Sequence, residues 1–205
     1  MISEEILPPY CGVAMGDVVL VQTPDDFARA LAVLSRADVL GFDTESKPVF
    51  HKGQASNGPH LIQLATDEQV FLIPIGRGVQ TDEIKAILES PTILKVGFGL
   101  SDDKQRLHAK LGVSTENVLD LARLLRTEPR CDVGAKTAVA QFFGQKLQKS
   151  KKISTSNWAI SPLSDKQKQY AADDAQVALR VYRAWLARQA AAPEVAADLP
   201  LSDTP

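Results

Sequence analysis

The sequence predicts an α/β domain whose mixed sheet combines an antiparallel meander with parallel strands and is flanked by helices. Two observations support this fold class. Three apolar runs between residues 39 and 75 follow one another closely enough to form a meander, and from residue 81 onward helical and strand-like patterns alternate. The length of 205 residues suits one domain with a single hydrophobic core.

The first half of the chain predicts mainly strands. The expected elements are a strand over 17–23, a helix that begins at Pro24, a strand over 39–46, a loop over 47–59, and strands over 60–66 and 69–75. Phe27, Leu31 and Leu34 recur at helical spacing and mark the buried face of that helix. The pair Asp67-Glu68 separates the last two strands, which predicts a hairpin.

The second half predicts helices that alternate with strands. The expected elements are a helix over 81–90, a strand over 92–100, a helix over 102–112, a strand over 117–122, a helix over 135–144, a loop up to residue 156, and a long helix to about residue 189. Gly112 and Gly144 are expected to end two of these helices, and Ser164 is expected to cap the start of the long one.

The pattern divides the chain into three parts. We expect an N-terminal extension at 1–16, the folded domain at 17–189, and a disordered tail at 190–205 that is rich in Ala, Pro and Asp. No run approaches the roughly 18 apolar residues of a membrane span, and the N-terminus lacks the features of a signal peptide. We therefore expect a cytoplasmic protein with no membrane partner.

The charge distribution is more informative than the net charge of −2, which does not by itself indicate a nucleic-acid-binding protein. From Val133 to Ser164 the chain carries several lysines and no acidic residue, so we expect a local basic surface. Cys11 and Cys131 have neither the spacing of a metal motif nor the density of a disulfide scaffold. We expect both to be reduced and incidental.

Two carboxylates lie two residues apart on the strand over 39–46. Side chains at such positions leave the same face of a sheet, so Asp43 and Glu45 place two negative charges side by side. For an isolated pair, the simpler interpretation is a strand end at which both carboxylates meet solvent.

Two further carboxylates fall on apolar helical stripes. Leu100, Leu107 and Leu111 define a stripe that passes through Asp103, so we expect Asp103 to point inward. Its neighbour Asp102 shares a polar flank with Arg106 and Lys110 in the same helix.

The long helix shows the same pattern. Val177, Ala178, Val181 and Trp185 form its apolar stripe, and stepping back along it reaches Asp174 and then Tyr170. We expect Asp173 instead to lie on the polar flank beside Gln176 and Arg180.

Ionised carboxylates on buried stripes cost several kcal/mol unless they are paired or coordinate a metal. Buried Arg or Lys side chains are one solution, although no basic residue falls on either stripe. Divalent cations are the other. Oxygen ligands without clustered His or Cys favour Mg²⁺ or Mn²⁺ over zinc.

Three motifs carry a family resemblance. In this order and at these intervals, FDTE, VGFGLSDD and YAADD resemble the exonuclease motifs of the ribonuclease D and Werner-type exonucleases. The segment SKKISTSNWA resembles the Werner-type branch, and the similarity runs from about Asp17 to Leu186. The resemblance implies a ribonuclease H-like fold.

The resemblance also implies an activity and the residues that perform it. Asp43, Glu45, Asp103 and Asp174 would hold two Mg²⁺ or Mn²⁺ ions, and Tyr170 would orient the attacking water. The implied enzyme is a 3′-5′ exonuclease that acts on DNA or RNA with a free 3′ end and releases 5′-mononucleotides. The alternatives are an oligoribonuclease for very short RNAs and a catalytically silent nucleic-acid-binding module of the same fold. The sequence does not indicate the oligomeric state.

A nucleotide cofactor is not expected, because Gly97-Phe98-Gly99 lacks the third glycine of a dinucleotide fingerprint. Seven more side chains are candidates for substrate binding: Thr44, Gln63, Lys149, Lys151, Lys152, Asn157 and Trp158. The lysines could follow phosphates or belong to a solvated loop. Core packing is the simpler interpretation for Trp158, and sheet packing is an equal alternative for Thr44 and Gln63.

Overall fold

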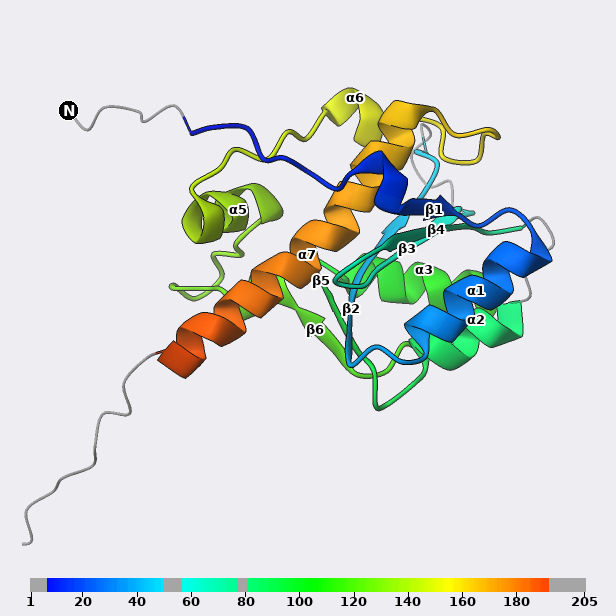
Figure 1. The fold of residues 1–205 in the computed structure, drawn as a ribbon, viewed down its shortest axis with the longest axis horizontal. Coiled ribbons are helices and arrows are strands. Elements are labelled where there is room, and N and C mark those ends of the chain that lie inside the picture. The colour runs from blue at the N-terminus through cyan, green and yellow to red at the C-terminus, as the bar shows by residue number, and fades with distance from the viewer. Residues whose placement is uncertain (1–6, 50–56, 77–80, 192–205) are drawn as a thin grey trace, which may run out of the picture.

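The sheet has six strands in the order β1-β4-β3-β2-β5-β6, with helices on both faces (Figure 1). It is seen in a computed structural model that describes residues 7–49, 57–76 and 81–191. In these ranges the strands are β1 (Val18–Leu20), β2 (Val39–Glu45), β3 (Leu61–Ala65), β4 (Val70–Pro74), β5 (Leu94–Gly97) and β6 (Val118–Asp120). The helices are α1 (Pro24–Leu34), α2 (Thr81–Leu88), α3 (Ser101–Leu111), α4 (Leu121–Leu124), α5 (Ala135–Phe143), α6 (Lys151–Ser154) and α7 (Asp165–Ala191), after a 3-10 turn at Met15–Asp17.

The strand pairing confirms the predicted mixed sheet. β2, β3 and β4 form the antiparallel meander, whereas β1 runs parallel to β4, and β5 and β6 continue the β2 side in parallel. The predicted hairpin between β3 and β4 is closed by Thr66, whose backbone N–H donates to the Gln69 carbonyl at 2.8 Å. The Gln69 N–H donates in turn to the Thr66 hydroxyl at 3.0 Å.

Strand β2 contributes to the core on both faces of the sheet. Leu40 and Phe42 are buried in a cluster with residues of α1, α2 and α3, whereas Val39 is buried in the cluster that contains α7. Because successive side chains of a strand point to opposite faces, Gly41, Asp43 and Glu45 lie on the α7 face. The predicted shared face of Asp43 and Glu45 is therefore confirmed.

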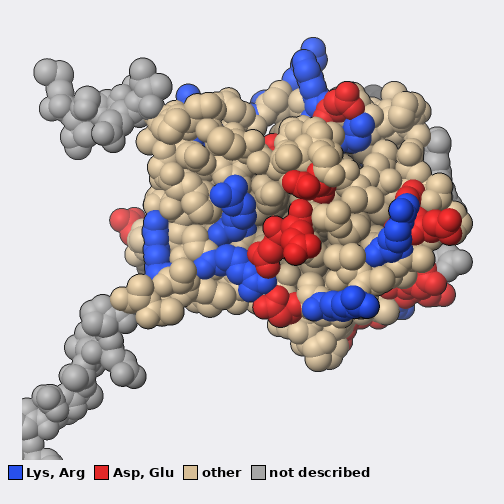
Figure 2. Space-filling model, viewed as in Figure 1, with Lys and Arg blue, Asp and Glu red and all other residues tan. Residues whose placement is uncertain are grey.

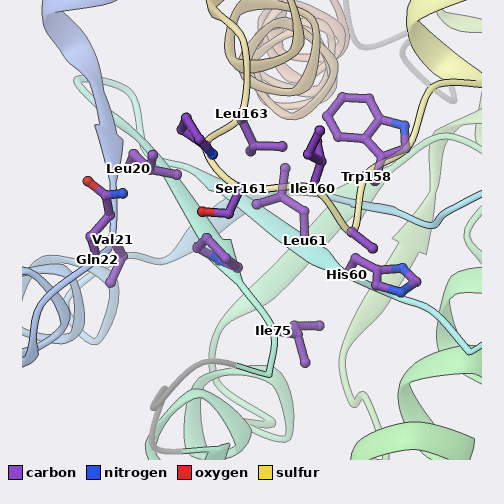
Figure 3. A pocket seen from close by; sticks show the side chains of 13 residues that line it. Leu20, Val21, Gln22, His60, Leu61, Ile75, Trp158, Ile160, Ser161 and Leu163 are labelled. Carbon is purple, nitrogen blue, oxygen red and sulfur yellow. The ribbon is translucent and has the colours of Figure 1, made fainter.

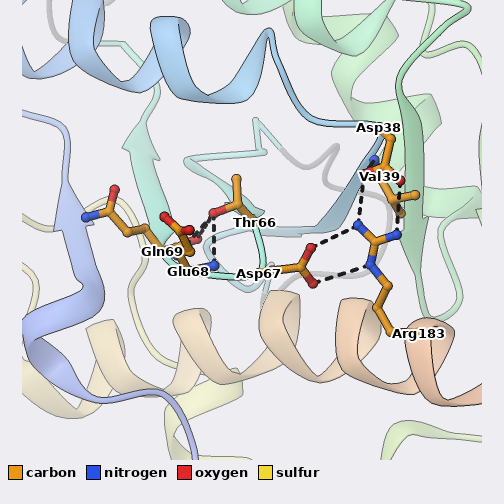
Figure 4. A network of polar contacts seen from close by, with 7 residues as sticks. All are labelled: Asp38, Val39, Thr66, Asp67, Glu68, Gln69 and Arg183. Atoms are coloured by element: carbon orange, nitrogen blue, oxygen red, sulfur yellow. Dashed lines mark hydrogen bonds and ion pairs between the residues drawn. The ribbon is translucent and has the colours of Figure 1, made fainter.

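The tightest contact between α7 and the sheet occurs at Gly41. A Cβ atom at this position would lie 2.0 Å from the carbonyl oxygen of Ala175, so only glycine allows the helix to approach β2 this closely. Farther along α7, the Arg183 guanidinium binds Asp38 at 2.8 Å and Asp67 at 2.9 Å (Figure 4). Asp38 precedes β2 and Asp67 lies in the hairpin turn, so Arg183 joins the helix to both.

Several predicted boundaries are wrong for local reasons. The strand predicted over 17–23 is restricted to 18–20, because a 3-10 turn precedes it and Thr23 forms a capping box at the start of α1. The strand predicted over 117–122 covers only 118–120. It ends there because the Asp120 carboxylate accepts the Ala122 N–H at 3.0 Å and caps the start of α4. The strand predicted over 92–100 covers only 94–97, since the chain turns into α3 at Ser101.

The lysine-rich loop and the long helix also differ from the prediction. Residues 151–154 of the expected loop form the single-turn helix α6. Helix α7 reaches Ala191 and thus includes the first two residues of the predicted tail. The remainder of that tail, together with residues 1–6 and part of the 47–59 loop, lies outside the described residues. None of the helices in the described ranges is both long and apolar enough to cross a membrane.

Replacing Gly41 tests the contact between α7 and β2. Gly41→Ala is expected to lower the free energy of unfolding by at least the roughly 1 to 3 kcal/mol of an overpacked core, because the new methyl group meets a backbone oxygen. Urea unfolding followed by circular dichroism measures the change. Gly16→Ala is the matched control, since nothing lies within 4 Å of its added Cβ. A Gly41→Ala protein as stable as the control would contradict the tight contact.

Candidate active site

The carboxyl end of β2 supplies two carboxylates. Asp43 and Glu45 are both half-buried on the face that α7 covers. In the described part of the chain neither of them forms an ion pair with Lys or Arg. Their negative charges therefore lie close together without a basic partner of their own.

Helix α7 lays a third carboxylate against this strand end. Asp174 is only 8% exposed, as its position on the predicted stripe requires, and Val177, Ala178 and Val181 on the same stripe are buried. Tyr170 lies one turn earlier and is half-buried. Because Gly41 brings Ala175 onto β2, the adjacent Asp174 is fixed next to the end of that strand.

The fourth carboxylate comes from the first turn of α3. Asp103 is 8% exposed, and its Oδ1 accepts a hydrogen bond of 2.5 Å from the hydroxyl of Thr44, which lies between Asp43 and Glu45 on β2. Asp102 is exposed and pairs with Arg106 at 3.7 Å. The predicted difference between the two adjacent aspartates is thus confirmed.

Burial and mutual repulsion disfavour the ionised forms of these groups. Burial, followed by the charges of Asp174 and Asp103, raises the pKa of Asp43 well above its usual value. Burial, followed by Asp43 and Asp174, raises the pKa of Glu45 to about 10. Burial also raises the pKa of Asp103 and of Asp174. The four carboxyl groups therefore belong to one electrostatic cluster.

Lys149 is an unexpected member of this cluster. Its Nζ lies 3.0 Å from Asp174 Oδ1 and 5.8 Å from the centre of the Tyr170 ring. Burial acts to lower the pKa of Lys149, but Asp174 and Asp43 outweigh it, so the pKa of Lys149 is raised. The alternative of a basic partner therefore holds for Asp174, although no basic residue falls on its apolar stripe. Helical periodicity missed this lysine because it lies outside regular secondary structure, before α6.

The donor set suits hard divalent cations, since it consists of carboxylate oxygens with no His or Cys among them. As the side chains stand, no three Asp, Glu, His or Cys residues in the described ranges are arranged to hold an ion. Two of the four carboxylates are engaged elsewhere, Asp103 with Thr44 and Asp174 with Lys149. The residues therefore fit divalent cations in chemistry and burial, and Asp174 must first exchange its partner.

Asp173 is held by two contacts that helical spacing did not indicate. It accepts the backbone N–H of Val13 at 2.9 Å and the side-chain amide of Gln169 at 2.9 Å. At Gly12, φ is +64° and an added Cβ would lie 2.7 Å from the Asp173 carboxylate. The first aspartate of the YAADD motif, Asp173, therefore holds the N-terminal segment against α7.

The same N-terminal segment reaches the lysine-rich region. The Tyr10 N–H donates to the Lys146 carbonyl at 3.0 Å, and the Lys146 N–H donates to the Pro8 carbonyl at 2.8 Å. These bonds anchor the chain three residues before Lys149. Residues of the predicted N-terminal extension thus hold the backbone of the segment that leads to Lys149.

Two of the substrate-binding candidates are buried inside the domain. Thr44 is 7% exposed and serves Asp103. Gln63 is fully buried opposite Asp43 in the β2–β3 register, and neither atom of its side-chain amide has a hydrogen-bond partner in the described structure. In this arrangement neither side chain is open to a nucleotide.

The remaining candidates lie in α6 or just after it. Lys151 and Lys152 are exposed, and so is Asn157, whose Oδ1 accepts the Ala159 N–H at 3.1 Å. Trp158 is 2% exposed, donates its indole N–H to the Ser154 carbonyl at 3.1 Å, and lies with its ring centre 6.1 Å from that of Tyr170. Trp158 therefore packs in the core and supports Tyr170.

A pocket of about 230 Å³ lies next to the carboxylate cluster (Figure 3). Figure 3 shows Trp158 and His60 on one side and Leu20 and Gln22 on the other. The backbone N–H of His60 donates to the backbone carbonyl of Glu45 at 2.7 Å, and the ring of Trp158 lies against that of Tyr170, so two lining residues of the pocket adjoin residues of the cluster. No sequence pattern indicated this pocket, because its lining comes from four separate segments.

The chain is similar to known 3′-5′ exonucleases over most of its length. A sequence profile described as 3′-5′ exonuclease matches residues 18–188. The mouse (Mus musculus) bifunctional 3′-5′ exonuclease/ATP-dependent helicase WRN is 31% identical over 156 residues, which is 73% of this chain and 11% of that protein. The EXO domain of Aedes aegypti Nibbler aligns with a TM-score of 0.75 and 28% identity over 87% of this chain and 91% of that one.

Escherichia coli RNase D, an exoribonuclease involved in structured RNA processing, aligns with a TM-score of 0.73 and 25% identity over 85% of this chain and 45% of that one. The chain spans between about a tenth and about half the length of the first curated relatives that it matches. Enzymes of this fold family generally use divalent metal ions. The Werner-type branch is not singled out, because the chain is also similar to Nibbler and RNase D.

The raised pKa of Glu45 predicts how pH affects the metal-free protein. Folding raises the pKa of this carboxyl from 4.5 to about 10. Its contribution to the free energy of unfolding is therefore fully present below pH 4.5 and is lost as pH rises toward 10. In EDTA, Tm is therefore expected to fall across this range, and Glu45→Gln should reduce the fall. The exposed Glu68→Gln is the control. Equal slopes of Tm against pH in Glu45→Gln and wild type would contradict the burial of this charge.

Proposed function

The chain belongs to the 3′-5′ exonuclease family, and from this premise we propose that it hydrolyses nucleic acid from the 3′ end and releases 5′-mononucleotides. One observation carries the proposal. Asp43 and Glu45 of β2, Asp103 of α3 and Asp174 of α7, all half-buried or buried, meet beside Tyr170. A catalytically silent module would not need to retain all four of these mutually repelling groups.

We propose two divalent cations, Mg²⁺ or Mn²⁺, as the cofactors. Bound to this cluster, they would supply Lewis acidity toward a phosphate and a more acidic water. Asp43 feels the charges of both Asp174 and Asp103, which supports its assignment as the ligand shared by both ions. Glu45 and Asp174 are assigned to one of the two sites, and Asp103 supports the other.

Tyr170 is assigned to the attacking water. Burial, followed by Asp174, raises the pKa of Tyr170 to about 12, so its hydroxyl stays protonated at neutral pH. A protonated phenol can donate a hydrogen bond but cannot remove a proton. We therefore propose that Tyr170 orients the water rather than acting as its base. The packing of Trp158 against the ring supports this role.

The substrate strand is proposed to pass the α6 region. Lys151 and Lys152 are exposed there, close in sequence to Lys149 in the carboxylate cluster. On the face drawn in Figure 2, basic and acidic side chains are interspersed, which favours phosphate contacts from a few lysines over a broad basic field. Such contacts weaken as salt rises, because bound counterions are released.

An activity assay on matched variants tests the proposed function. Asp103→Asn is expected to lower kcat/KM roughly 10³-fold, because several kcal/mol of metal-dependent stabilisation is lost. Asp102→Asn is expected to stay near wild type, because Asp102 is exposed and pairs with Arg106. Shortening of 5′-labelled single-stranded DNA, recessed-end DNA and RNA is followed with Mg²⁺ or Mn²⁺ present.

The outcomes separate the possible functions. If the wild type shortens none of these substrates, or shortens them no faster than Asp103→Asn does, the enzyme proposal fails and a binding module remains. A comparison of a dinucleotide with a 20-mer RNA identifies the other alternative. Rapid hydrolysis of the dinucleotide alone would indicate an oligoribonuclease.

The role of Tyr170 makes a separate prediction. Tyr170→Phe keeps the ring contact with Trp158 and loses only the hydroxyl, so kcat is expected to fall roughly 10²-fold while KM stays within about twofold. Steady-state kinetics on a short single strand measure both constants. A raised KM with an unchanged kcat would assign the hydroxyl to substrate binding instead.

A further inference from the structure

Lys149 places a positive charge at the position where cations are expected. Its ammonium group lies 3.0 Å from Asp174 Oδ1 and faces the ring of Tyr170. The Asp174 side chain in this pair is only 6% exposed, whereas that of Lys149 is 28% exposed. The lysine thus enters the carboxylate cluster from the solvent side and neutralises part of its negative charge.

The backbone before Lys149 is held firmly. Leu147 is 4% exposed within the cluster of apolar residues under α7, and the adjacent Lys146 is bonded on both sides to the N-terminal segment. After Lys149, the chain continues into α6 with the exposed Lys151 and Lys152. Lys149 thus follows an anchored stretch of backbone, so a change in its side-chain conformation alone would take its ammonium group from Asp174 toward solvent.

An ammonium group and a divalent cation compete for the same oxygen atoms. Two positive charges a few ångströms apart in a partly buried site repel each other strongly. While Lys149 engages Asp174, no three carboxylates in the described ranges are arranged to hold an ion. Metal uptake and the contact between Lys149 and Asp174 are therefore expected to exclude each other.

We propose that Lys149 is a mobile counter-ion, which neutralises Asp174 in the metal-free protein, leaves it when divalent cations bind, and then contacts a phosphate of the substrate strand. The inference rests on the proposed function, since it assumes both the metals and the nucleic acid. It links the two binding events through one side chain. Metal binding frees the ammonium group of Lys149, which then binds a phosphate of the substrate.

The inference predicts effects of opposite sign on two equilibria. Removing the charge of Lys149 lowers the competition for Asp174, so the affinity for metal should rise. The same change removes a phosphate contact, so the affinity for nucleic acid should fall at saturating metal. A lysine with only a structural role would weaken both equilibria, and a solvated lysine would change neither.

The test measures both equilibria in Lys149→Gln. Isothermal titration with Mn²⁺ is expected to show a Kd roughly tenfold lower than that of wild type, as for the loss of one competing ion pair. Fluorescence anisotropy with a single-stranded oligonucleotide whose 3′ linkages are phosphorothioates is expected to show roughly three- to tenfold weaker binding at saturating Mn²⁺. In EDTA, Tm should be lower than that of wild type, because Asp174 has lost its partner.

Two further variants make the result specific. Lys152→Gln removes the same charge from exposed α6 and is expected to leave the Mn²⁺ affinity within twofold. Lys149→Arg keeps the charge and is expected to retain an affinity for Mn²⁺ close to that of wild type, which assigns the effect to the charge; circular dichroism checks that Lys149→Gln is folded. An unchanged or weaker Mn²⁺ affinity in a folded Lys149→Gln protein would overturn the proposal. If the wild type takes up no Mn²⁺, the proposed function itself fails, and the role of Lys149 fails with it.

Discussion

The close approach of α7 to β2 at Gly41 determines where the functional groups lie. The backbone carbonyl of Ala175 packs against Gly41, and the residue before Ala175 in the helix is Asp174. Asp43 is two residues beyond Gly41 on the strand and points to the same face. Arg183 prevents the helix from sliding by binding Asp38 and Asp67 near the other end of the sheet. A bulkier residue at position 41 would move one carboxylate away from the other.

This architecture gathers negative charge at the expense of the stability of the metal-free fold. Burial raises the pKa of all four carboxyl groups, and repulsion within the cluster adds to it for Asp43 and Glu45, so ionisation is unfavourable without positive partners. The partners found are the Thr44 hydroxyl for Asp103 and the Lys149 ammonium for Asp174. Perturbed groups of this kind are typical of functional sites. Their instability without metal supports a site whose proper partner is a cation of higher charge.

Periodicity was sufficient to predict the fold class and the orientation of the key aspartates. Asp103 and Asp174 are buried on apolar stripes, whereas Asp102 faces solvent, as the helical spacing requires. Contacts between distant segments were beyond this method. Asp173 binds Val13, which is 160 residues away in sequence, and Lys149 reaches Asp174 from an irregular segment. Neither contact has a periodic signal, and the ends of β1, β5 and α4 depend on caps and turns that have none either.

The most direct test of the account is to locate the bound metal. A crystal grown with Mn²⁺ allows an anomalous difference map to show the ions independently of any assay. The account predicts two Mn²⁺ peaks among the carboxylates of Asp43, Glu45, Asp103 and Asp174, with Lys149 turned away from Asp174. Peaks elsewhere on the molecule, or none in this cluster at saturating Mn²⁺, would contradict it.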